Sequence, residues 1–159
     1  MYSPRWLFFY PGIFLAVIGA VAMIWLMTGP IKIDGISFDV NAMLYAALLV
    51  IVGVQTIYFA IFSKVFGVTN KLIPSNKLID RFLGVFSLER GLAIGGIVVL
   101  LGIAGLIYAI MFWGERTFGP LVPGNIMRIT IPSITLTLVG VQTIFSSFFL
   151  AVLSLKTKN

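Results

Sequence analysis

The chain has 159 residues, of which 60% are hydrophobic and 10% are charged, and its formal net charge is +6. Its mean hydropathy of +1.11 lies far above that of soluble domains and excludes a water-soluble fold. It contains no Cys and no His. Disulfides, thiol chemistry and imidazole ligands are therefore excluded, and we expect no metal and no cofactor.

Four long runs carry no charged residue: 6–31, 40–63, 91–114 and 129–155. Each exceeds the roughly 20 helical residues that cross a hydrocarbon core of about 30 Å, and a helix satisfies its own backbone polar groups there. We predict an all-α polytopic membrane protein, one transmembrane domain over 1–159 with spans near 7–27, 42–63, 91–113 and 129–153. The first run is too long for a signal peptide, and no small-residue cleavage pattern precedes Lys32.

The ends and connections of these helices carry their own signals. The first helix is expected to begin near Pro4, to bend or restart at Pro11, and to end near Thr28–Pro30. Residues 31–42 read as a short polar connection. The 64–90 loop contains a stretch, 77–86, with apolar residues at helical spacing, which predicts a short amphipathic helix in the membrane surface. A connecting turn packed on the bundle is the alternative.

The basic residues are distributed unevenly. Eight Lys and Arg fall in the N-terminus, the 64–90 loop and the C-terminus, against three in the 28–41 and 114–128 segments. Because cytoplasmic loops are enriched in Lys and Arg, we predict a multi-pass protein of the plasma membrane with both termini in the cytoplasm. Anionic head groups would attract this basic face.

The hexapeptide VGVQTI occurs at 52–57 and again at 139–144, 87 positions later. In the predicted topology both copies lie at matching positions of parallel helices, which indicates two tandem hairpins. The preceding helices match weakly, as RWLFFYPG at 5–12 against ERGLAIGG at 89–96. An internal duplication is favoured, and chance or a shared packing demand is the alternative.

Gln55 and Gln142 are the most polar side chains deep in the predicted spans. An unpaired amide is unfavourable there, so each is expected to face another helix and to form a hydrogen bond worth about 1 kcal/mol. The functional alternative is a polar spot that contacts a lipid phosphate or a permeating solute. On the fourth helix, Gln142 shares a stripe with Thr135, Ser146 and Phe149, which we interpret as a packing seam first.

Other patterns concern head groups and helix packing. Four basic residues are candidates for binding lipid head groups: Lys77, Arg81, Arg90 and Arg5. For Arg90 the alternative is that Ser87–Gly91 simply caps the third helix. Small residues at Gly91 and Gly95, and at similar spacing in the first helix, favour close helix approach and a central position for the first and third helices.

The carboxylates show no spacing suited to acid–base or metal chemistry. No charge is expected within the membrane, which argues against ion-coupled transport.

Several segments together resemble a known family. They are YSPRWLFFYPG (2–12), FDV (38–40), SLERGL (87–92), FGPL (118–121) and VGVQTIFSSFFLAVLSL (139–155). In this order they are similar to the C-terminal membrane domain of family 2 glycosyltransferases of the polyprenyl-phosphate, or dolichol-phosphate mannosyltransferase-like, type. The resemblance implies a cytoplasmic catalytic domain that transfers a sugar from a nucleotide donor to polyprenyl phosphate. None of that domain's donor-binding or metal-binding residues has a match in this sequence.

We therefore expect a membrane anchor and lipid platform for such an enzyme, with no catalytic residues of its own. Its expected partners are membrane lipids, polyprenyl phosphate and a glycosyltransferase catalytic domain in cis or trans, but no nucleic acid. Self-association stays open. The chain is expected to be an expressed membrane domain, a split-gene product or a remnant. The rival functions are a small flippase-like transporter of lipid-linked sugars and a structural subunit of a membrane complex.

Overall fold

A computed structural model describes residues 5–33, 36–69, 88–114 and 123–155. Its elements in chain order are a π-helix η1 (Arg5–Phe9), α1 (Tyr10–Met27), β1 (Ile31–Ile33), β2 (Ile36–Phe38), α2 (Val40–Thr69), α4 (Leu88–Gly114) and α5 (Pro123–Leu155). Four helical segments are long and apolar enough to cross a membrane: Leu7–Met27, Val40–Thr69, Leu88–Gly114 and Ile126–Leu153. The predicted all-α polytopic class is confirmed. The amphipathic stretch 77–86 lies outside the described residues.

The first span changes its helix type near Pro11. Residues Arg5–Phe9 form a π-helix, and α1 follows from Tyr10 with Pro11 in its first turn. Proline has no N–H to donate, so the hydrogen-bond pattern is interrupted there, as the sequence predicted. At the other end of α1, the Thr28 hydroxyl donates to the Trp25 carbonyl at 2.7 Å. Gly29 follows with φ +152°, a value that side chains disfavour and that ends the helix.

The predicted polar connection after α1 contains a small antiparallel hairpin. Strand β1 pairs with β2, with Ile31 opposite Phe38 and Ile33 opposite Ile36. Apolar and polar residues alternate in both strands, which is the period of a strand with two different faces. The helical pattern of the flanking spans does not extend into this segment.

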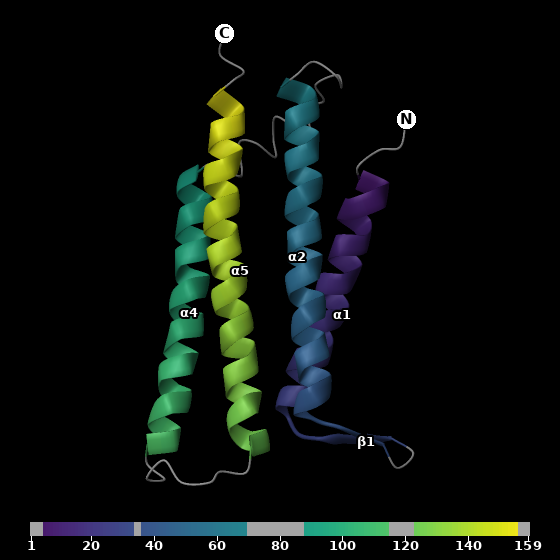
Figure 1. Cartoon of the computed structure of the whole chain (residues 1–159), viewed down its shortest axis with the longest axis vertical. Helices are drawn as coiled ribbons and strands as arrows, with labels where there is room; N and C mark the ends of the chain where they lie inside the picture. Colours follow the sequence, from purple (N-terminus) through teal and green to yellow (C-terminus); the bar gives the residue numbers. More distant parts are fainter. Residues whose placement is uncertain (1–4, 34–35, 70–87, 115–122, 156–159) are drawn as a thin grey trace.

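The helices form a row of two hairpins rather than a closed ring (Figure 1). The contacts place α4 along α5, α1 along α2, and α2 against α5. Helices α2 and α5 are therefore central, and the expectation that the first and third helices are central is wrong. The first and third helices, α1 and α4, each pack chiefly on their own hairpin partner. The start of η1 and the end of α5 lie at one end of the row, and β1 lies at the other (Figure 1).

Glycine contacts bring α1 and α2 together. A Cβ on Gly12 would lie 2.9 Å from the Gly53 carbonyl oxygen and 2.9 Å from Ile57 Cγ1. About two helical turns further along α1, a Cβ on Gly19 would lie 2.6 Å from the Ala46 carbonyl oxygen. Real Cβ atoms do not approach this closely, so the spacing of the two backbones depends on these glycines.

The second hairpin repeats this packing atom for atom. A Cβ on Gly95 would lie 2.9 Å from the Gly140 carbonyl oxygen and 2.7 Å from Ile144 Cγ1, and one on Gly102 would lie 2.8 Å from the Ser133 carbonyl oxygen. The partner atoms on α5 are those of α2 moved by 87 positions. The two-hairpin fold predicted from the repeated hexapeptide is thus confirmed.

The structure also corrects the alignment of the preceding helices. Gly12 corresponds to Gly95, 83 positions later, because both occupy the same contact. The weak match in the sequence had paired Gly12 with Gly96, which has no atom within 4 Å of an added Cβ. The two segments remain dissimilar in the corrected register, where Gly12 and Gly95 are the one identical pair between 5–12 and 88–95.

A buried apolar cluster lies near the β1–β2 end, where α1, α2 and α5 meet. Met43 is fully buried, and around it pack Met23, Leu26, Ala46, Ala47 and Ile131. This cluster and the polar contacts described next hold the two hairpins together.

Candidate functional site: the α2–α5 seam

Helices α2 and α5 meet along a line that we call the α2–α5 seam, and polar side chains bridge it. The Tyr58 hydroxyl donates a hydrogen bond to Thr143 Oγ1 at 2.7 Å. The Thr143 hydroxyl in turn donates to the Val139 carbonyl at 2.7 Å. One turn away, the rings of Phe62 and Phe149 meet edge to face with centroids 4.8 Å apart. The seam therefore combines a directional polar link with an aromatic contact.

The stripe predicted on the fourth helix lies largely in this seam. Thr135 and Ser146 are buried, and the Thr135 hydroxyl donates to the Ile131 carbonyl at 2.8 Å. Gln142 is half-buried, and its Oε1 is enclosed without a hydrogen-bond partner. Phe149 contacts Phe62 of α2. The stripe brings these residues together as a packing surface, but it does not supply the expected hydrogen bond to the Gln142 oxygen.

Gln55 differs from its counterpart in the repeat. It was expected to face another helix, yet it is exposed on α2. The residues of α2 that turn toward α1 and α5 are Gly53 and Tyr58. Gln55 precedes Phe62 by seven residues, so it lies at the edge of the side of α2 that meets α5, with its side chain exposed.

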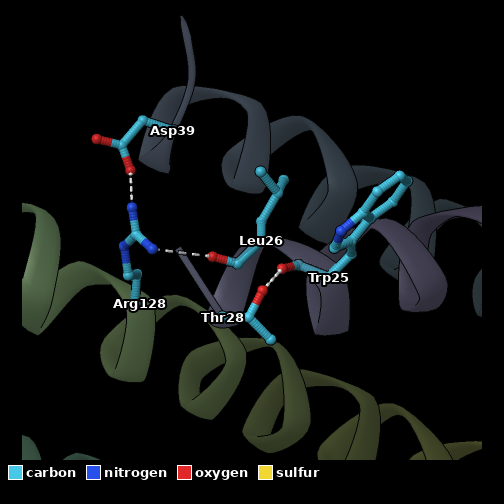
Figure 2. Close-up of polar contacts among 5 residues, drawn as sticks. All are labelled: Trp25, Leu26, Thr28, Asp39 and Arg128. Carbon is cyan, nitrogen blue, oxygen red and sulfur yellow. Dashed lines mark hydrogen bonds and ion pairs between the residues drawn. The ribbon is translucent and has the colours of Figure 1, made fainter. Parts of the chain in front are cut away.

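An ion pair joins the hairpins at the β1–β2 end (Figure 2). The guanidinium of Arg128 lies 2.5 Å from Asp39 Oδ1 and donates to the Leu26 carbonyl at 3.3 Å. The side chain of Arg128 is 14% exposed and that of Asp39 is 42% exposed. One cation thus links the C-terminal end of α1 and the N-terminal end of α2 to α5.

The helix ends explain why these groups suit each other. Leu26 belongs to the last turn of α1, where carbonyls lack partners within the helix and a cation is favoured. Asp39 precedes α2, and its carbonyl accepts the first helical hydrogen bond, from Met43 N at 3.2 Å. A carboxylate is favoured at that N-terminal end. The Arg128 Nε is buried without a partner, so the guanidinium is not fully satisfied.

Sequence reasoning missed this pair. It counted Arg128 and Asp39 only as loop charges and began the fourth helix at 129, whereas α5 begins at Pro123. Arg128 therefore lies within the fourth helix, near the start of the apolar segment Ile126–Leu153, and not in the preceding loop. The available signal was the parallel direction of the second and fourth helices. It places their starts, with opposite charges, at one membrane surface.

The predicted head-group residues are only partly within the described chain. Lys77 and Arg81 lie outside it. Arg5 begins η1, and Arg90 is exposed in the first turn of α4 beside the exposed Glu89. Their elements place Arg5 and Arg90 at the end of the row opposite Arg128 (Figure 1).

An open apolar groove of about 280 Å³ lies between α1 and α2 near the β1–β2 end. Trp25, Phe38 and Tyr45 line it together with aliphatic residues. Its lining offers no cation for a phosphate. Within the described ranges there is also no group of three His, Cys, Asp or Glu side chains that could hold a metal. The lining of this groove suits contact with hydrocarbon.

Comparison with known proteins gives a consistent result. Residues 61–154 match the family model described as "Glycosyltransferase family 2 C-terminal transmembrane region". The chain is also 30% identical over 152 residues to the low-salt glycan biosynthesis hexosyltransferase Agl6 of Haloferax volcanii. That match covers 93% of this chain and 35% of Agl6, so the chain spans about a third of the relative's length. No solved structure matches it.

The match begins within α2 and extends through α4 and α5. It therefore includes nearly the whole second hairpin and the part of α2 from residue 61 onward. By this match over more than half of its length, the chain belongs to the family of glycosyltransferase family 2 C-terminal transmembrane regions.

Proposed function

We propose that this chain anchors a glycosyltransferase catalytic domain at the plasma membrane and forms a lipid-facing platform for its acceptor, a polyprenyl phosphate. The catalytic domain, in cis or in trans, supplies the sugar from a nucleotide donor. The chain itself supplies no catalytic residue. The observation that carries the proposal is the family match over residues 61–154.

The similarity to Agl6 supports the glycosyltransferase part. That relative is a hexosyltransferase by name, and the aligned chain corresponds to about a third of it. The remaining two thirds of such a protein has room for a catalytic domain outside the membrane. A membrane region joined to that domain would keep it at the surface where a lipid-linked acceptor is found.

The charges at the two ends of the helical row support an orientation. At the end where η1 begins, basic residues lie at Arg5 and at the exposed Arg90. At the other end, the cation of Arg128 is already paired with Asp39. The first end is therefore the one suited to anionic lipid and to the cytoplasm, with both termini on that side.

The exposed surface of the helices supports the platform. Large apolar side chains are exposed along all four spans, including Phe14, Leu100 and Phe145. Because the helices form a row and not a closed bundle, much of each span is available to hydrocarbon. An isoprenoid tail can lie along such a surface while its phosphate stays at the basic end, near Arg90.

Native mass spectrometry of the purified chain with polyprenyl phosphate tests the proposal. The parent chain should retain polyprenyl phosphate better than the corresponding polyprenol, because only the phosphate can pair with arginine. The double variant Arg81→Ala with Arg90→Ala should retain less of it and keep its helicity. Equal retention by parent and double variant would contradict the assignment of these arginines to the acceptor.

A pull-down from native membranes tests the anchoring part separately. It should recover a family 2 catalytic domain, unless that domain is covalently joined to the chain in its native protein. Recovery of a different class of enzyme would contradict the anchoring role.

A further inference from the structure

The two glutamines of the repeated hexapeptide belong to the two helices of the α2–α5 seam. These helices run in the same direction, since both begin at the β1–β2 end (Figure 1). The rings of Phe62 and Phe149 touch across the seam. Gln55 precedes Phe62 by seven residues, and Gln142 precedes Phe149 by seven, which is about two helical turns on each helix. The glutamines therefore lie at the same depth and on the same side of the seam.

The two helices stay side by side at this depth. Toward the β1–β2 end, Asp39 and Arg128 pair at an offset of 89 positions. Just beyond the glutamines, the Tyr58 hydroxyl reaches Thr143 at an offset of 85 positions. The glutamines are 87 positions apart and lie between these two contacts. The helices therefore remain packed where the glutamines lie, and the two side chains are within reach of each other.

Each amide can supply what the other lacks. The Gln142 Oε1 atom is enclosed without a hydrogen-bond partner, which is unfavourable in an apolar medium. The side chain of Gln55 is exposed and forms no hydrogen bond with another described residue. An amide carries both N–H donors and an acceptor oxygen, so Gln55 offers the missing donor. The rotatable bonds of its side chain let the amide turn toward the seam without a movement of the helix.

We propose that Gln55 and Gln142 form an amide pair across the seam in the membrane, with Gln55 Nε2 donating to Gln142 Oε1. Gln55 is the residue that moves, because the Gln142 oxygen is enclosed by its surroundings. Hydrocarbon favours the paired arrangement, since it offers neither amide a partner.

The pair explains why both copies of VGVQTI contain a glutamine. The glycine of each copy packs within its own hairpin, whereas the two glutamines join one hairpin to the other. Gln55 lies near the middle of α2, so this joint lies deep in the membrane, while Arg128 and Asp39 join the hairpins at the β1–β2 end. The proposal does not depend on the identity of the acceptor lipid.

Paired cysteines test the proximity, since the chain has no cysteine of its own. In the full chain in lipid nanodiscs, a short bifunctional thiol reagent should link Gln55→Cys to Gln142→Cys within one chain, as measured by intact mass. Thr56→Cys with Gln142→Cys is the matched control. Thr56 precedes Tyr58 by two residues, so it points about 200° away from the side of α2 that meets α5. Equal linking of both pairs overturns the proposal, as does failure to link the glutamine positions.

A double-mutant cycle tests the hydrogen bond itself. Gln55→Leu leaves the enclosed Gln142 oxygen without its donor, so it should lower the folded-to-unfolded equilibrium constant in mixed micelles about fivefold. Gln142→Leu removes the acceptor and should lower the constant as well. The double variant should lose no more than the weaker single variant, because leucines in both positions leave no polar group unpaired. Additive losses, or no loss with Gln55→Leu, overturn the proposal.

Thr56→Val provides the control for this cycle. The Thr56 hydroxyl donates to the Val52 carbonyl of its own helix. Combined with Gln142→Leu, Thr56→Val should therefore have a strictly additive effect. A coupling as large as that between the two glutamines would overturn the proposal, because it would show no preference for the amide pair. Helicity by circular dichroism confirms that each variant is folded.

Discussion

The two hairpins share one backbone arrangement but differ in what fills it. In α1–α2 and in α4–α5, equivalent glycines meet equivalent backbone atoms, at offsets of 83 positions for the first helix of each hairpin and 87 for the second. The polar content is not shared. The buried polar residues of the described chain all lie on α5: Ser133, Thr135, Thr143, Ser146 and Ser147.

Equivalent positions on α2 are mostly apolar. Ala46 stands where α5 has Ser133, Val50 where it has Thr137, and Ala60 where it has Ser147. The hydroxyls on α5 are satisfied locally, since Ser133, Thr137 and Ser147 each donate to the carbonyl four residues earlier.

These hydroxyls also face glycines of α4. Added Cβ atoms on Gly91, Gly102 and Gly105 would meet the hydroxyls of Ser147, Thr137 and Ser133. A hydroxyl that bonds its own helix needs no partner across the interface, so it can replace an alanine or valine wherever the opposing helix has room. Close packing by small residues is thus common to both hairpins, whereas the hydroxyl groups at this interface distinguish the second hairpin from the first.

The largest effect is expected from breaking the shared feature in either hairpin. Gly53→Ala would place Cβ 2.5 Å from Ala16 N, and Gly140→Ala would place it 2.7 Å from Val99 N. Since backbone atoms cannot swing away, the helices must separate, and each variant should lose about 1–3 kcal/mol of unfolding free energy. Unfolding in mixed micelles measures this loss.

Gly96→Ala is the control for both variants, because no atom lies within 4 Å of an added Cβ. It should not destabilise the protein. Equal stability of Gly96→Ala and Gly140→Ala would contradict the role of close packing, and a loss in one hairpin alone would break the equivalence between the two.

The next effect concerns a contact that has no counterpart within either hairpin. Arg128→Leu removes the cation from Asp39 and from the Leu26 carbonyl. Because Asp39 remains 42% exposed, we expect a loss of about 1–2 kcal/mol, less than for a fully buried pair. Unfolding of Arg128→Leu, Asp39→Asn and the double variant measures the coupling. Strictly additive losses would show that the pair does not join the hairpins.

A smaller effect is expected at the seam. Tyr58→Phe removes the hydroxyl that donates to Thr143 and makes this position resemble its equivalent on α5, Phe145. The expected loss is about 0.5–1 kcal/mol, typical of one hydrogen bond between membrane helices. Tyr45→Phe at an exposed position should leave stability unchanged. An equal loss of stability with Tyr45→Phe would show that removing a tyrosine hydroxyl destabilises the protein without any role for the bond to Thr143.

The smallest effect is expected from exchanging the residues by which the hairpins differ. Thr137→Val removes a hydroxyl that bonds only the Ser133 carbonyl, and Val50→Thr adds one able to bond its own helix in the same way. Each should change the unfolding free energy by no more than about 0.5 kcal/mol. A loss above about 1 kcal/mol with Thr137→Val would mean that the hydroxyl also acts across the interface.

Much of the fold was predictable because membrane helices follow from local composition. The charge-free runs predicted the four spans, and the repeated VGVQTI predicted the tandem hairpins, because Gly53 and Gly140 occupy the same contact. The order of the row was not predictable in this way. Glycines of α1 and α4 indicated close packing, but a glycine stripe does not say how many neighbours a helix has.

The site was less predictable, since it depends on which faces meet. The sequence indicated a polar stripe with Thr135 and Ser146 on the fourth helix, whereas the different exposure of Gln55 and Gln142 depends on how the helices pack. The Arg128–Asp39 pair joins residues 89 positions apart. Sequence patterns assigned both residues to loops. They meet because α2 and α5 begin side by side at the same end of the row.

The central claim is that both hairpins enter the membrane from the cytoplasm. The basic end of the helical row is then the cytoplasmic end, where the proposed acceptor phosphate binds. Single-cysteine labelling in intact cells and inverted vesicles tests it most directly in this cysteine-free chain. Cysteines at Lys71 and Lys158 should react only from the cytoplasmic side, and a cysteine at Ser37 only from outside. Labelling of Ser37→Cys from the cytoplasmic side would contradict the account.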